Sequence, residues 1–515
     1  MFNKILQNFG AWVRMQLPLL KLVMLSTLSY GILVVSLNYA HFPMGRFVDI
    51  FPVLGHWLLI TMSAGVIIYL LALHRWIFTL LFPIFMVCTG IIGYYIFQYD
   101  ITINTAVIES TFNTNNSEVM SQISLRLTLY VIILVVVSIW LVRKRRELTQ
   151  PHLILGHLPF IIVGFLLIST INQIRFNTIY QRNPFCIYLG FKNYFAERTE
   201  LKKERKAITD GAICKADSLT VVVVIGEALR ADHVSLNGYP RKTFPHMAKE
   251  GAISFKHIYS EWTHTLKSIP HILTRADSAN HAPATDEHSF ISIFKACNYT
   301  AWWLGNQDLN KVFKPFALEC DTFIINKPFK SDYNFTGKYD EELLPYLDQV
   351  LKLPNPRKLV IFHQVGSHWY YPSYYPPSFE YFKPVLKSKS FDLKDKQKII
   401  NAYDNSARYT DYVLWQIIER IRRKKTIMIY LSDHGELLGE NGKWIHAQDT
   451  EYEKNPACMV WFSDSYRKAY PDKVQAAEHN KNLRFRSDFL FHSVLDAGEI
   501  LSPYRQDKLS IFKNK

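Results

Sequence analysis

Residues 219–233, with the sequence LTVVVVIGEALRADH, contain the pattern that decides the fold of this 515-residue chain. Leu219–Ile225 is a β-branched run with almost no polar alternation, as expected for a parallel strand that is covered on both faces. Helix-like stretches such as Phe290–Cys297 and Lys398–Arg423 separate it from three similar runs, which are Ala301–Leu304, Leu359–Phe362 and Thr426–Leu431. This alternation of strands and helices predicts an α/β sandwich.

Three of these predicted strands are followed by side chains suited to chemistry. They are Glu227 after the first strand, His368 after the third, and Asp433, His434, Glu436 and His446 after the fourth. Ligands of open α/β sheets bind beyond the carboxyl ends of the strands, so we expect these side chains to share one site. Each residue alone is more often a helix cap or a buried hydrogen-bonding group than a ligand. Together they favour a metal site, and Glu, Asp and His suit zinc or manganese.

The N-terminal third has a different composition. Residues 1–171 contain ten basic and five acidic residues and are otherwise almost wholly apolar. Five runs are long enough to cross a hydrocarbon core of about 30 Å. These runs are Leu22–Tyr39, Val53–Leu73, Trp76–Phe97, Leu127–Val142 and Leu153–Ile171. The sequence therefore predicts a five-helix transmembrane domain over residues 1–171. In the whole chain, 49% of the residues are hydrophobic and 20% are charged, which excludes a disordered protein. Six cysteines are too few for a disulfide scaffold.

The distribution of Lys and Arg predicts the orientation of these spans. Basic residues lie before the first span, between the second and third, and in the run Arg143–Arg146 after the fourth. The loop Tyr99–Ser124 has three acidic residues and no basic one. We therefore expect a cytoplasmic N-terminus and a first span that is an anchor rather than a removed signal peptide. An odd number of spans then exports everything after Ile171.

Residues 172–215 are predicted to form an interfacial amphipathic linker, and residues 216–515 the exported domain. Asn172–Lys206 has eight basic and three acidic residues together with many aromatic ones, a mixture that suits the lipid headgroup layer. A packed linker helix with solvated lysines explains this segment equally well. Beyond residue 171 the chain carries a net charge of +10, which favours an anionic membrane surface.

The order of these parts resembles the membrane-anchored phosphoethanolamine transferases of Gram-negative bacteria, in the alkaline phosphatase superfamily. Five motifs carry the resemblance, which covers nearly the whole chain. They are IGEALRADHVSLNGYPRKTFP (225–245), THTLKSIP (263–270), VGSH (365–368), NAYDN (401–405) and YLSDHGELLGENGKWIH (430–446). The resemblance implies that the exported α/β sandwich is of the alkaline phosphatase and sulfatase type.

The resemblance also implies roles for individual residues. The implied zinc ligands are Glu227, Thr265, Asp433 and His434. Thr265 is also the implied nucleophile, and Thr263 is the competing hydroxyl two residues before it. His368 and His446 match histidines that act on the substrate phosphate or hold a second zinc, beyond the one that is firmly bound. Substrate contacts are implied at four further positions, which are Asn306, Gln307, Lys311 and Glu436.

The chain departs from the family pattern in two places. Family members commonly flank the nucleophile with a cysteine pair, whereas this chain has Glu261 and His271 at those positions. The histidine of VGSH is usually followed by Gly-Pro, whereas here Trp369 and Tyr370 follow, which puts the acceptor in doubt. Five cysteines lie beyond residue 171, so at least one is unpaired, and Cys297 with Cys320 is the suggested disulfide.

The implied reaction moves phosphoethanolamine from phosphatidylethanolamine to lipid A or the lipopolysaccharide core, through a covalent phosphoethanolamine-threonine. The implied place is the bacterial inner membrane, with the catalytic domain in the periplasm. We expect a monomer with no nucleic-acid partner. The main alternative is a phosphoglycerol transferase or another metal-dependent phosphatase or sulfatase-like hydrolase, although a sulfatase would need a modified Cys or Ser in place of Thr265. Few intramembrane charges and no inverted repeat argue against a transporter.

Overall fold

The computed structural model consists of two compact units. One contains Met1–Phe195 and Phe329–Phe335, and the other contains Ala196–Pro328 and Thr336–Lys515. The structure describes residues 2–99, 101–105, 107–108, 111, 123–148, 157–174, 179–200, 203–309, 312–330, 337–388 and 393–515.

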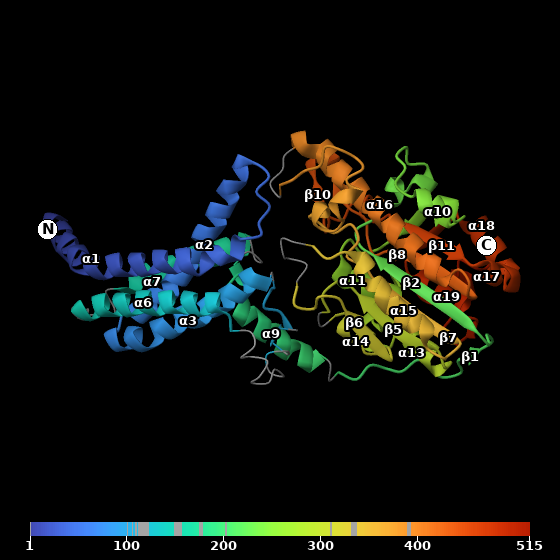
Figure 1. The fold of residues 1–515 in the computed structure, drawn as a ribbon, viewed down its shortest axis with the longest axis horizontal. Coiled ribbons are helices and arrows are strands. Elements are labelled where there is room, and N and C mark those ends of the chain that lie inside the picture. The colour runs from blue at the N-terminus through green and yellow to red at the C-terminus, as the bar shows by residue number, and fades with distance from the viewer. Residues whose placement is uncertain are drawn as a thin grey trace. The chain divides into compact units, whose positions relative to one another are not determined.

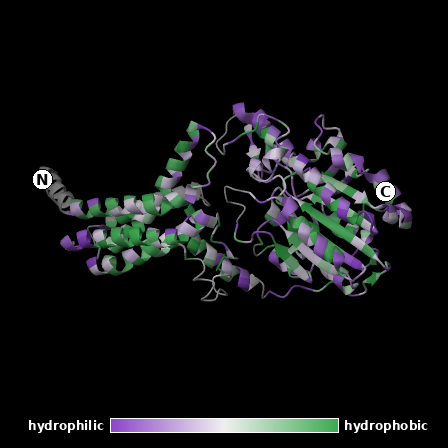
Figure 2. Ribbon diagram, viewed as in Figure 1, coloured by the Kyte–Doolittle hydropathy of each residue, from purple (hydrophilic) through white to green (hydrophobic). Residues whose placement is uncertain are grey.

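The first unit consists mainly of helices. Its long helices are α1 (Phe2–Leu33), α2 (Ile50–Ala72), α3 (Arg75–Tyr99), α6 (Leu125–Glu147), α7 (Leu158–Ile174) and the first part of α9 (Phe185–Glu200). In the described part of the chain, four segments are long and apolar enough to cross a membrane: Gln16–Tyr39, Phe47–Ala72, Arg75–Gln98 and Leu125–Glu147. Figure 2 shows how strongly apolar residues are concentrated in these helices. The first four predicted spans are therefore confirmed.

The predicted fifth span, Leu153–Ile171, begins outside the described residues. Its described part is α7, which has 17 residues and ends at Ile174. This helix is shorter than the roughly 20 residues that a hydrocarbon core requires, so it does not by itself establish a count of five. α9 begins directly after Pro184.

Arg145, near the end of α6, shows how this unit holds a buried charge. Its Nε donates a 2.7 Å hydrogen bond to the carbonyl of Ala72, and its Nη2 donates to the carbonyl of Leu73. These carbonyls end α2 and have no partners within that helix. A cation next to the negative end of a helix dipole is stabilised, so this arginine joins α6 to α2.

The second unit is built on a seven-stranded sheet with the order β3-β11-β8-β2-β7-β5-β6. The strands are β3 (Ile253–Phe255), β11 (Cys458–Phe462), β8 (Thr426–Ser432), β2 (Leu219–Gly226), β7 (Arg357–His363), β5 (Thr300–Gly305) and β6 (Thr322–Ile325). β8, β2, β7, β5 and β6 run parallel, and β11 is antiparallel to both of its neighbours. All four strands that the sequence predicted are confirmed.

Helices cover both faces of this sheet (Figure 1). α11 (Thr265–Leu273), α13 (Phe290–Ala296) and α19 (Phe489–Ala497) pack on the face that carries Val221 and Val223. α10 (Pro245–Lys249), α15 (Leu344–Lys352) and α16 (Lys396–Ile421) pack on the face that carries Val222 and Val224. β2 is therefore buried on both sides, which explains its unbroken apolar run. Each buried valine contributes roughly 1.5–3 kcal/mol to stability.

The suggested disulfide between Cys297 and Cys320 is wrong, because all six cysteines are free thiols. Both side chains are buried in the apolar cluster between the sheet and α13. A buried thiol behaves as a small apolar group, and the packing of this cluster explains both cysteines without a covalent bond.

Gly226, the last residue of β2, provides a test of this packing. A Cβ atom at this position would overlap the hydroxyl of Tyr430, which is fully buried in β8. Gly226→Ala should therefore lower the free energy of unfolding by about 1–3 kcal/mol, as measured by urea unfolding of the full chain in detergent. Gly55→Ala is the control, since a Cβ atom there would contact nothing within 4 Å. Equal midpoints for the two variants would contradict this description of the core.

Candidate active site

Glu227 leaves the sheet directly after β2. The next residue, Ala228, has a φ angle of 55°, so the backbone turns sharply beyond the strand end. The Glu227 side chain is 1% exposed. Its Oε2 accepts hydrogen bonds from Gln307 Nε2 at 2.8 Å and from Thr265 Oγ1 at 3.1 Å. Its Oε1 has no hydrogen-bond donor among the described residues.

Asp433 and His434 follow β8, the parallel neighbour of β2. Asp433 Oδ1 accepts backbone N–H bonds from Ala228 at 3.2 Å and His434 at 2.8 Å, which fixes the carboxylate. His434 Nδ1 lies 2.7 Å from the carbonyl of Gly435 and must carry the proton there, because a carbonyl only accepts. The other ring nitrogen, Nε2, then lies 3.4 Å from Glu227 Oε1 and 3.5 Å from Asp433 Oδ2.

Thr265 approaches these groups from α11, of which it is the first residue. Its Oγ1 lies 3.4 Å from His434 Nε2, in addition to its bond to Glu227. Further along α11, Ser268 Oγ donates a 2.5 Å bond to the carbonyl of Asp433, which holds the helix against the end of β8. The hydroxyl of Thr265 is therefore fixed beside two carboxylates and an imidazole, at the positive end of a helix.

The donor set fits a divalent metal ion. One ligand atom from each of Glu227, Asp433 and His434 lies within 4.8 Å of the others. Glu227 Oε1 and Asp433 Oδ2 are buried and lack a hydrogen-bond donor in the described part of the chain. Buried carboxylate oxygens without partners are costly, and a cation would compensate both. An imidazole that donates its other N–H to a carbonyl is the usual form of a metal-bound histidine.

The pKa values in this cluster reflect the same crowding. Burial, together with the negative charge of Glu227, raises the pKa of Asp433 to about 6. Burial alone would lower the pKa of His434, but the charges of Asp433 and Glu227 raise it to about 10. Burial would likewise raise the pKa of Glu227, but its interaction with the protonated ring of His434, 3.4 Å away, holds this pKa below its ordinary value. A bound dication would displace the proton of His434 and take over its role.

His446, Glu436 and His368 lie next to this cluster. The His446 ring centroid is 4.6 Å from that of His434 and 6.5 Å from that of His368. His446 Nδ1 lies 3.4 Å from Glu436 Oε2. Burial would lower the pKa of His446, but Glu436 raises it above its ordinary value, whereas burial lowers the pKa of His368. The two histidines therefore favour different protonation states, as an acid–base pair requires.

The remaining predicted substrate contacts differ in their surroundings. Gln307 Nε2 donates to Glu227 and to the carbonyl of Gln364, so this side chain positions the carboxylate. Asn306 is fully buried and donates to Asp340 rather than into open space. Lys311 lies outside the described residues.

Asp340 is a supporting residue that sequence reasoning missed. Its two oxygens accept the backbone N–H groups of Val365 at 2.9 Å and Gly366 at 3.0 Å, in the turn that leads from β7 to His368. Burial raises its pKa to about 6. The residue lies in the run DEEL, where an acidic residue normally indicates a solvated surface, so no signal in the sequence distinguished it.

Glu261 and His271, two departures from the family pattern noted in the sequence, each contact another group. Glu261 accepts a 2.8 Å ion pair from Arg486, and His271 Nδ1 donates to the carbonyl of Lys267 within α11. Thr263, the competing hydroxyl, is buried, and its carbonyl accepts the N–H of Ala447. The hydroxyl of Thr265, in contrast, contacts both a carboxylate and an imidazole of the candidate metal site.

The fold and this site place the chain in the alkaline phosphatase class of α/β proteins. Residues 220–500, more than half of the chain, match the family described as Sulfatase, and the chain belongs to that family. Residues 61–180 match a second family, described as phosphoethanolamine transferase EptA/EptB. The resemblance predicted from the motifs is therefore confirmed.

Individual relatives agree with this assignment. Phosphoethanolamine transferase EptA of Escherichia coli K12 is 29% identical over 307 residues, which cover 57% of this chain and 55% of that protein. Kdo(2)-lipid A phosphoethanolamine 7''-transferase of the same strain is 28% identical over 53% of this chain and 49% of that protein. Each alignment thus spans about half of the relative. The structure of lipooligosaccharide phosphoethanolamine transferase A from Neisseria meningitidis matches 95% of this chain and 97% of its own, with a TM-score of 0.54 and 21% identity, and so shares its fold.

Gln307 allows a test of how the carboxylate is positioned. Gln307→Leu keeps the approximate volume but removes the N–H group that Glu227 Oε2 accepts. Since residues that orient metal ligands contribute about 10–100-fold to affinity, this variant should weaken zinc binding by that factor, as measured by competition with a chelator. Gln506→Leu, at an exposed position, is the control. Equal zinc affinities would show that Gln307 does not position Glu227.

Proposed function

We propose that this protein transfers phosphoethanolamine from phosphatidylethanolamine to a membrane glycolipid, lipid A or the lipopolysaccharide core, through a covalent phosphoethanolamine-threonine at Thr265. The observation that carries the proposal is the contact of Thr265 Oγ1 with both Glu227 and His434. A hydroxyl held against a candidate metal site at a helix N-terminus is suited to attack phosphorus. The names of the two Escherichia coli relatives give the same transferred group, phosphoethanolamine.

Glu227, Asp433, His434 and Thr265 would hold a zinc ion, and a second ion near His368 and His446 is part of the proposal. Bound zinc lowers the pKa of a coordinated hydroxyl and offsets negative charge on phosphate oxygens. The carboxylates and the neutral imidazole suit zinc, although the same set also accepts manganese.

The side chains of the candidate active site have different roles in the reaction. The Oγ–H bond of Thr265 breaks as its oxygen bonds to phosphorus, and its proton passes to Glu227, which accepts its hydrogen bond. The bond from phosphorus to the diacylglycerol oxygen breaks in the same step. His446, whose pKa is raised by Glu436, is suited to protonate that leaving oxygen. In the second half, a hydroxyl or phosphate of the acceptor gives up its proton, bonds to phosphorus and releases the oxygen of Thr265, which regains a proton. His368, whose pKa is lowered by burial, is suited to accept the proton of the acceptor.

The proposal includes a place in the cell. Five helices, with α7 as the fifth, anchor a monomeric chain in the bacterial inner membrane, with a cytoplasmic N-terminus. Residues 172–215 form an interfacial linker, and residues 216–515 form the catalytic domain in the periplasm. The lipid donor is then met at the surface of the bilayer, which explains why a catalytic domain would keep a membrane anchor.

Exchange of Thr265 tests the nucleophile. Thr265→Ala should abolish labelling of the protein by phosphatidylethanolamine that carries a labelled headgroup, and should abolish transfer to lipid A, because no oxygen remains to form the intermediate. Thr263→Ala is the matched control, as its hydroxyl lies two residues away on the same segment. If Thr263→Ala lost the label and Thr265→Ala kept it, the nucleophile would be Thr263. Labelled phosphatidylglycerol, offered in parallel, separates this proposal from a phosphoglycerol transferase.

Metal analysis tests the ligand set. Glu227→Gln and Asp433→Asn each keep the side-chain shape but remove a negative charge from the site, so zinc bound per chain should fall at least about tenfold. Zinc is measured by mass spectrometry of the purified full chain. Glu478→Gln, which changes an exposed carboxylate on the surface, should retain the wild-type zinc content. Unchanged zinc in the first two variants would contradict the proposed ligands.

A further inference from the structure

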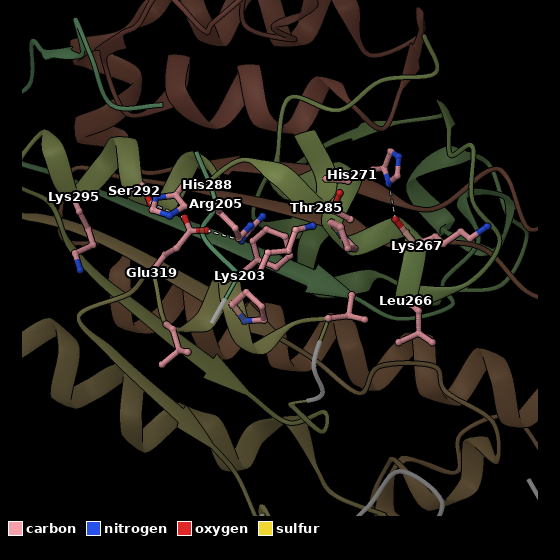
Figure 3. Close-up of a pocket in the computed structure, with 16 residues that line it drawn as sticks. Lys203, Arg205, Leu266, Lys267, His271, Thr285, His288, Ser292, Lys295 and Glu319 are labelled. Atoms are coloured by element: carbon pink, nitrogen blue, oxygen red, sulfur yellow. Dashed lines mark hydrogen bonds and ion pairs between the residues drawn. The ribbon is translucent and has the colours of Figure 1, made fainter. Parts of the chain in front are cut away.

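A second cavity lies on the other side of α11 from the site described above. It has a volume of about 710 Å³, and its lining includes Leu266 and Lys267, the two residues that follow Thr265. Figure 3 shows Lys295 at one end of this cavity and Lys267 at the other, with Lys203 and Arg205 between them. The same helix therefore borders both the candidate nucleophile and a basic cavity.

The cations of the cavity outnumber its acids. Four lysine and arginine side chains line it. In the described part of the chain, Glu319 is the one acidic residue of the lining. Glu319 is already neutralised, since it forms an ion pair with Arg205 at 3.2 Å. It also accepts hydrogen bonds from the hydroxyls of Ser289 and Ser292. Three lysines thus remain around the space.

Two of these lysines have partners that a ligand could replace. Lys203 lies 3.1 Å from Asp286, and Lys295 lies 3.2 Å from Asp321, and all four side chains are at least one-third exposed. Exposed ion pairs contribute about 0–1 kcal/mol each to stability. The two aspartates therefore position the lysine amines without binding them tightly. Lys267 lies over the ring of Trp262 at 4.4 Å.

The remaining lining combines apolar side chains with Thr285, Ser292 and two histidines. Leu266 and Leu318 are 51% and 47% exposed, and Phe316 packs under the guanidinium of Arg205 at 4.3 Å. A cavity that combines several ammonium groups with exposed leucines suits an amphiphile that carries more than one negative charge. An anion without an apolar part would leave half of this lining unused.

From these features we infer that the cavity binds the phosphorylated head of the glycolipid acceptor. The inference rests on the proposed function. A phosphate monoester carries a charge of about −1.5 to −2 at neutral pH, which three lysines can offset. The phosphatidylethanolamine headgroup has no net charge, since its ammonium cancels its phosphodiester, and it does not need such a site. Binding here would hold the acceptor against α11, the helix that begins at Thr265.

The test separates the two halves of the reaction. The variant Lys203→Ala/Lys295→Ala, studied as the full chain in mixed micelles, should raise KM for lipid A at least about tenfold, because two charge-assisted contacts are lost. Labelling of the protein by the donor without acceptor should stay within about twofold of wild type. Lys468→Ala/Lys508→Ala removes the same charge from exposed positions and should leave both quantities unchanged.

Direct binding gives a readout that does not depend on transfer. The lysine variant should bind vesicles containing lipid A at least about tenfold more weakly than wild type, and should bind vesicles containing dephosphorylated lipid A equally. An unchanged KM with unchanged binding overturns the inference, and so does an equal loss of donor labelling, which would assign the cavity to the donor. If the wild-type chain transfers nothing, the proposed function fails, and vesicle binding still decides whether the cavity recognises phosphorylated lipid.

Discussion

The burial of two carboxylates beside one imidazole is the constraint on which the site depends. Glu227 and Asp433 lie at the ends of adjacent parallel strands and are removed from water, yet each keeps one oxygen without a hydrogen-bond donor among the described residues. Like charges this close raise each other's pKa, and the rise for Asp433 to about 6 expresses that cost. Protonated His434 offsets part of it in the metal-free protein. A dication offsets more, so metal binding and the stability of these strand ends are coupled.

The sheet supplies the precision that such a site needs. Ile225 of β2 pairs with His363 of β7 and with Leu431 of β8, so three strands end at the same level. Asp433 Oδ1 binds the backbone N–H of Ala228, and Asp340 binds the turn after β7. The segments that leave the sheet are thus tied to one another by buried polar groups. Hydrogen bonds of this kind hold the side chains around a metal site in the narrow geometry that a metal ion requires.

Much of this arrangement could be predicted from the sequence because it follows from local pattern. Short apolar runs identified β2, β5, β7 and β8, and the rule about carboxyl ends of strands brought Glu227 and Asp433 into one region. Thr265 could not be found in this way. It reaches the site from a helix that packs on one face of the sheet, and only the resemblance pointed to it. Asp340 was missed because its partners are backbone N–H groups, which leave no trace in side-chain patterns. The fifth span stayed undecided because α7 has only 17 described residues.

α11 connects the separate observations. Ser268 binds the carbonyl of Asp433, so the helix is attached to the metal-ligand loop through its buried face. Lys267, on the opposite face, borders the basic cavity. The hydrogen bond of Ser268 and the ion pair of Glu261 with Arg486 hold this segment. The position of Thr265 therefore depends on polar contacts just before the helix and in its first turn. Thr265 and part of the lining of the basic cavity therefore belong to the same short helix.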